Sequence, residues 1–211
     1  MAGVYLKQCI SFFNETKFDD TLDFAQFHNI LNIYLAITSQ IDSIEDEMEV
    51  DKVIELIMEQ GMDPMKSEIM YTCLHIMSNI ALMRSSDSGS VVIKQGLVRM
   101  FGNYVVEEQF HDLPLKHKSI IYTILTYSLE DLHQEDENVT ESAKAILSHC
   151  MEMLGPILGN SDDISKRQEI YIAGIVELFG ATLRKLSVTS NGGLDLNVII
   201  FCGYQYFFYF F

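Results

Sequence analysis

The chain has 211 residues, of which 48% are hydrophobic and 21% are charged, so it is long and apolar enough for a sizeable core and unlike a disordered protein. Only 3 prolines and 12 glycines accompany 11 methionines and many leucines and isoleucines, a composition that favours an all-α protein over a β-sandwich or barrel. Thirty acidic residues against 14 basic ones give a formal charge of -16, which argues against direct binding of nucleic acid and suits a basic protein or peptide partner.

The first residues of the chain do not have the pattern of a secretory leader, so we expect no export. Their apolar pieces, 3–6 and 9–13, are too short for the hydrophobic region of a secretory leader. The 4 cysteines are scattered, without a C-x-x-C motif or a disulfide framework. We therefore expect a cytoplasmic or nuclear protein that uses no metal and no cofactor.

Four long helices are predicted, because apolar residues recur at intervals of three and four. The first contains 24–35, and the others cover 66–83, 116–132 and 165–186. Further helical segments are expected before the last three, at 50–58, at 90–95 and 97–105, and at 138–158. The segments 90–95 and 97–105 are separated by Gly96, which is expected to break the helix.

The long helices recur at a nearly constant period. If Ala36, Ala81, Ser128 and Ile175 are equivalent core positions, they lie 45, 47 and 47 residues apart. Helical repeats with periods in the forties are typical of armadillo and HEAT proteins. The sequence thus predicts an α-solenoid of about three to four armadillo-like repeats over residues 1–193. A single helical bundle with accidentally similar spacings is the alternative.

One part of the chain resembles a known family. Residues 73–81 read Cys-Leu-His-Ile-Met-Ser-Asn-Ile-Ala, and residues 91–98 read Val-Val-Ile-Lys-Gln-Gly-Leu-Val. Together they resemble an armadillo repeat of importin alpha (karyopherin alpha). In that family, tryptophan and asparagine one turn apart on each long helix form a ladder along a concave groove, which binds lysine-rich nuclear localisation peptides. The resemblance implies a protein-binding scaffold in nucleocytoplasmic protein transport.

The resemblance also indicates candidate partner-binding residues. Asn79 takes the asparagine place, and His75 takes the tryptophan place four residues earlier. The chain contains no tryptophan, so the ladder is largely lost and a conventional import signal should bind weakly. In the first long helix the two places hold Ile30 and Tyr34. The candidate partner-binding residues are His75, Asn79, Tyr122 and Thr126, and the expected partner is a protein or a basic peptide segment.

No catalytic pattern accompanies these residues. The chain has no phosphate-binding glycine loop, no G-x-S-x-G nucleophile motif and no H-E-x-x-H zinc motif. We therefore expect a protein that is not an enzyme. Two alternatives stay open: a helical subunit of a larger complex without groove recognition, and a small helical enzyme with a site assembled from distant residues.

The end of the chain differs in composition from the predicted repeats. Residues 194–211 form a hydrophobic tail that is rich in Phe and Tyr, and we treat it apart from the repeat domain. A membrane anchor is disfavoured, because a span needs about 20 apolar residues and this tail includes Asp195, Asn197 and Gln205. Whether the tail packs on the repeats is left open, and no pattern indicates an oligomeric state.

Overall fold

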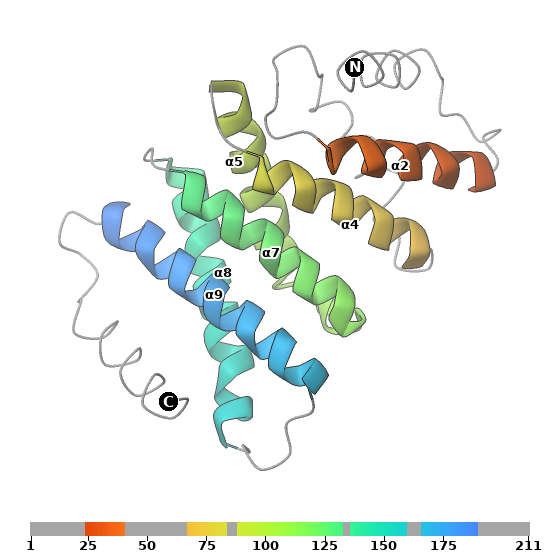
Figure 1. Cartoon of the computed structure of the whole chain (residues 1–211). Helices are drawn as coiled ribbons and strands as arrows, with labels where there is room; N and C mark the ends of the chain where they lie inside the picture. The colour runs from red at the N-terminus through yellow and green to blue at the C-terminus, as the bar shows by residue number, and fades with distance from the viewer. Residues whose placement is uncertain (1–23, 41–66, 84–87, 133–135, 160–165, 190–211) are drawn as a thin grey trace.

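The computed structural model describes residues 24–40, 67–83, 88–132, 136–159 and 166–189 (Figure 1). Within these ranges all regular secondary structure is helical, which confirms the all-α prediction for the described part of the chain. The expected helix at 50–58 and the tail at 194–211 lie outside the described residues. The helices are α2 (Phe24–Thr38), α4 (Ser67–Leu82), α5 (Ser88–Tyr104), α6 (Glu108–His111), α7 (Leu115–Asp131), α8 (Glu137–Gly159) and α9 (Lys166–Thr189).

The predicted long helices agree closely with α2, α4, α7 and α9, but the predicted break at Gly96 is wrong. Gly96 lies inside α5, which is one continuous helix. Ile93 and Leu97 are buried on either side of this glycine, so the apolar stripe continues through it. Glycine inside a helix costs roughly 1 kcal/mol relative to alanine, and the packing of this stripe outweighs that cost.

Local signals fix where two of the later helices begin. Asp136 precedes α8, and its Oδ1 accepts hydrogen bonds from the backbone N–H groups of Asn138 at 2.8 Å and Val139 at 3.2 Å. This is the arrangement of a helix N-cap. Pro114 precedes α7, where its missing N–H does no harm and its carbonyl accepts from the backbone N–H of His117.

The helices form two layers. The long helices α2, α4, α7 and α9 lie side by side, with α4 between α2 and α7, and α7 between α4 and α9 (Figure 1). The second layer contains α5 and α8, which pack against each other, α5 against α7 and α8 against α9.

Neighbouring long helices run in the same direction. At the first turns of α4 and α7, Nε2 of His117 donates to the carbonyl of Ser67 at 3.0 Å. At the opposite ends, the ammonium of Lys94 bonds to the carbonyl of Met83, just after α4, at 2.7 Å and contacts Asp131 of α7. The intervening helix α5 therefore returns the chain from the end of α4 towards the start of α7 (Figure 1).

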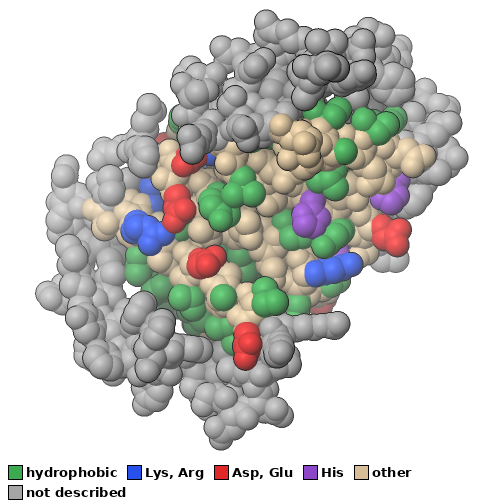
Figure 2. Space-filling view, viewed as in Figure 1, with side chains coloured by type: hydrophobic (Ala, Val, Ile, Leu, Met, Phe, Trp, Pro, Cys, Tyr) green, Lys and Arg blue, Asp and Glu red, His purple; other side chains and the backbone are tan. Residues whose placement is uncertain are grey.

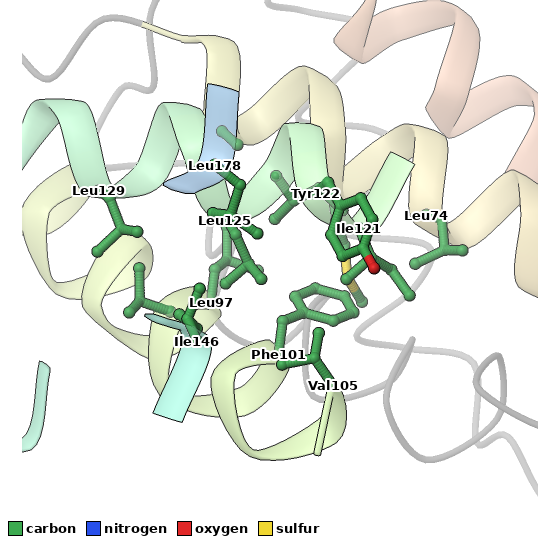
Figure 3. Packing of buried hydrophobic residues seen from close by; sticks show 14 of the residues in the cluster. Leu74, Leu97, Phe101, Val105, Ile121, Tyr122, Leu125, Leu129, Ile146 and Leu178 are labelled. Carbon is green, nitrogen blue, oxygen red and sulfur yellow. The ribbon is translucent and has the colours of Figure 1, made fainter. Parts of the chain in front are cut away.

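The core lies between the two layers. Leu97 of α5 lies beside Ile146 of α8, and Phe101 lies below Tyr122 of α7 (Figure 3). The α5 and α8 backbones approach closely at Gly102, where an added Cβ would be 3.0 Å from the Cβ of Ser142. Glycine at this position is what permits the close packing of the second layer.

Candidate partner-binding face

The outer side of the long helices carries a stripe of accessible side chains. We call this stripe on α2, α4 and α7 the long-helix face, and Figure 2 looks onto it. Its members recur at intervals of three, four or seven residues, as one side of a helix requires. They are Asn29, Ile33 and Ala36 of α2, Tyr71, His75, Asn79 and Leu82 of α4, and Lys116, Thr123, Tyr127 and Glu130 of α7.

Two of the four predicted contact residues lie on this face. His75 and Asn79 are half-buried and sit one turn apart on α4. The amide Nδ2 of Asn79 donates to the hydroxyl of Thr38 at 3.2 Å, and this bond links α4 to the end of α2. The Asn79 side chain is therefore held in a fixed orientation at the junction of two long helices.

The other two predicted contact residues are in the core, and the structure corrects their placement. Tyr122 is 0% exposed and Thr126 is 7% exposed, so neither side chain is available on the surface. The Tyr122 hydroxyl lies 2.9 Å from Nε2 of His149 and 3.1 Å from the hydroxyl of Tyr171. This buried cluster joins α7, α8 and α9.

A register shift of one residue explains the error. The α7 side chains on the long-helix face are Thr123 and Tyr127, which immediately follow the predicted pair in sequence. One residue turns a helix by about 100°, which moves a side chain from the surface into the core. On α2 the error has the opposite sign: the face residues Asn29 and Ile33 precede the predicted pair Ile30 and Tyr34 by one residue, and Tyr34 is buried. Ala36 is exposed although it was predicted to be a core position.

The polar stripe of α7 could have revealed this register. Lys116, Ser119, Thr123, Tyr127 and Glu130 recur at intervals of three and four, and all are exposed or half-buried. Apolar residues alone are ambiguous here, because α7 is buried by neighbours on several sides. The side that carries polar groups identifies the surface directly.

Aromatic contacts surround Tyr71 at the start of the face. Its ring centroid lies 4.5 Å from that of His75, edge to face, and 5.5 Å from that of His117. The Lys116 ammonium lies over the Tyr71 ring, 4.5 Å from the centroid. Burial lowers the pKa of His75 and of His117 below the ordinary value, and the Lys116 ammonium lowers that of His117 further, against the opposing effect of its hydrogen bond to Ser67.

The middle of the face carries almost no charge. Helix α2 contains no Lys, Arg, Asp or Glu, and α4 contains only Glu68, in its first turn. On α7, Glu130 bonds to Arg184 of α9, with Nη2 and Oε1 2.5 Å apart. The acidic run at 42–51 lies outside the described residues.

Nothing within the described ranges points to metal or thiol chemistry. No group of three or more His, Cys, Asp or Glu side chains there could hold a metal ion. Burial raises the pKa of Cys73 and of Cys150 to about 12, so both thiols stay protonated and unreactive. Among the described helices, none has the length and apolar character to cross a membrane.

Comparison with known proteins gives no match: no family model, no curated protein and no solved structure matches the chain. The resemblance to importin alpha therefore depends on residues 73–98 and on the spacing of the long helices.

Proposed function

We propose that this chain is a protein-interaction scaffold, an α-solenoid of armadillo-like units that binds a protein or peptide along the long-helix face. The observation that carries the proposal is the side-by-side, parallel stacking of α2, α4, α7 and α9 (Figure 1). In an up-and-down bundle, consecutive helices joined by short loops are antiparallel neighbours around one core. Stacked parallel helices with return helices behind them instead leave one broad side free.

The side chains on that free side support a role in binding. Ile33, Leu82 and Tyr127 are 53%, 50% and 41% exposed, and each comes from a different long helix. Asn79 lies among them and offers a peptide backbone a fixed amide group. Large apolar side chains combined with an oriented polar group are typical of surfaces that bind a partner.

The proposed scaffold is similar to the nuclear import adaptor in architecture and differs from it in recognition. His75 and Asn79 hold the two ladder places on α4, whereas Thr123 and Tyr127 hold them on α7. Repeated indole and amide clamps for lysine are therefore lacking, and a conventional import signal should bind weakly. We place the protein in the cytoplasm or nucleus, without catalytic activity.

A second candidate function is a helical subunit that assembles through another surface. Ile170 and Val176 of α9 are 68% and 43% exposed, so α9 also presents apolar side chains. A subunit of this kind would need no recognition on the long-helix face.

The test is selection of binding peptides from a random-peptide phage library, followed by titration of fluorescein-labelled copies against variants. Leu82→Asp and Tyr127→Asp should each weaken binding by about tenfold or more, because each buries a charge in an apolar contact. Met151→Asp is the matched control, since Met151 is 44% exposed on α8 in the other layer. If no peptide is selected, or if all three variants bind equally, the proposed function is wrong.

A further inference from the structure

The aromatic ring of Tyr71 already has a cation bound to it from within the chain. A cation within about 6 Å of a ring centroid is attracted by the negative face of the ring, and Lys116 Nζ lies at 4.5 Å. The two residues come from the N-terminal parts of neighbouring long helices, α4 and α7. His75 and His117 contact the same ring, so Tyr71 is enclosed by groups of its own chain.

We propose that Lys116 occupies the position that a lysine or arginine of a partner would otherwise take, so that the long-helix face selects an uncharged segment with aliphatic side chains. This inference rests on the proposed function, because it concerns the partner of the same face. It makes Lys116 a specificity-determining residue that excludes basic segments.

Exclusion follows from both contact and charge. An incoming ammonium group would need the ring that Lys116 covers, and it would meet a like charge within a few ångströms. The face offers little compensation, since the only acidic residue of α4 is Glu68 and Glu130 is paired with Arg184. A lysine-rich segment would therefore lose its hydration without gaining partners.

An uncharged aliphatic segment matches the remaining surface. Ile33, Leu82 and Tyr127 provide apolar area that an aliphatic side chain can cover, and α2 contributes no charge. Asn29 and Asn32 are exposed on α2, and Asn79 lies between them and α7, so amide groups are available to an extended backbone. This surface is complementary to a segment that is itself neutral.

The net charge of -16 does not reverse this preference at physiological salt. It attracts basic segments at long range, but interactions between exposed charges are screened beyond about 8 Å at 0.15 M ionic strength. Contacts on the face then decide which segment stays bound. Long-range attraction affects the rate of encounter more than the strength of the final complex.

The first experiment measures binding of a fluorescein-labelled lysine-rich peptide at physiological salt to the full chain and to variants. Lys116→Ala should tighten binding by about threefold, because it frees the ring and removes the like charge. Lys144→Ala is the matched control: it makes the same change in net charge at an exposed position on α8. In a Tyr71→Leu background, Lys116→Ala should have no larger effect than Lys144→Ala.

Two results would overturn the role of Lys116. One is an equal change in peptide affinity on Lys116→Ala and on Lys144→Ala. Absence of binding to all of the proteins counts as this result. The other is tight binding of the lysine-rich peptide to the wild-type chain that survives added salt. Circular dichroism of each variant checks that the helices are retained.

The second experiment determines the composition of peptides selected from the random library. On the wild-type chain, peptides that lose affinity with Leu82→Asp should be rich in Leu, Ile and Val and poor in Lys and Arg. If such peptides are lysine-rich, the face binds peptides but the inferred chemistry is wrong. If no selected peptide responds to Leu82→Asp, the proposed function fails as well, so the two failures are distinguishable.

Discussion

The Tyr122 hydroxyl joins three helices through two hydrogen bonds, and a single substitution tests what they contribute. Tyr122→Phe removes the hydroxyl but keeps the ring, so His149 and Tyr171 each lose a buried partner. We expect a loss of about 1 to 3 kcal/mol in the free energy of unfolding. Tyr127→Phe is the control, because the Tyr127 side chain is partly exposed and its change should cost less than about 0.5 kcal/mol. Urea unfolding followed by circular dichroism gives both values, and equal values would contradict the prediction.

His149 makes the stability of the chain dependent on pH. Burial, together with the positive groups His111 and Lys118, lowers the pKa of His149 from 6.5 to about 4. Between these values the unfolded chain binds a proton that the folded chain does not, so stability falls as pH falls from about 6.5 to about 4. The full loss is about 3 kcal/mol.

Replacing His149 identifies its share of this pH dependence. His149→Gln keeps hydrogen-bonding capacity near Tyr122 without a titrating ring, so the slope of stability against pH should become shallower. It should not vanish, since the pKa of His117 is lowered as well. Thermal unfolding at a series of pH values is the measurement. His111→Gln should give a profile between those of the wild type and His149→Gln, because it removes one of the groups that lower the pKa of His149. A wild-type profile in His149→Gln would contradict the assignment.

At the scale of the elements, two glycines in α5 should respond in opposite ways to the same substitution. An added Cβ at Gly96 would meet nothing within 4 Å, so Gly96→Ala should stabilise the protein by up to about 1 kcal/mol through helix propensity. At Gly102 the added Cβ would lie 3.0 Å from the Cβ of Ser142. Overpacking of this kind costs about 1 to 3 kcal/mol, so Gly102→Ala should destabilise.

The comparison of these two variants is internally controlled, because the residue type, the helix and the substitution are shared. Chemical denaturation of both variants and the wild type measures the difference. Stabilisation by Gly102→Ala to the same extent as by Gly96→Ala would show that α5 and α8 do not approach closely.

The positions of the helices could be predicted from the sequence, but not every side chain that they bury. The periodicity predicted where α4, α7, α8 and α9 lie, because their apolar stripes are long and regular. Ser128 is buried as predicted, but the sequence did not show that the buried side of α7 also includes Tyr122 and Thr126, since their residue types suit either a core or a surface. The contact of Lys116 with Tyr71 was not predictable either, because it depends on how two helices distant in sequence align.

At the scale of the whole molecule, stacking predicts that stability varies along the chain. Among the described helices α2 packs chiefly against α4, whereas α7 packs against α4, α5 and α9. Hydrogen exchange of the native protein should therefore be fastest in α2 and slowest in α7. Mass spectrometry of exchanged peptides measures this order. Uniform protection across all helices would instead indicate one cooperative core, as a closed bundle would have.

Two buried lysines bond to carbonyls that precede them in the chain, which matters for the order of folding during synthesis. Lys94 bonds to the carbonyl of Met83 after α4, and Lys185 of α9 bonds to the carbonyl of Leu132 after α7 at 2.7 Å. In both cases the group that completes the end of a long helix comes from a later part of the chain. During synthesis the carbonyls of Met83 and Leu132 must therefore bond to water until the ribosome has released Lys94 and Lys185.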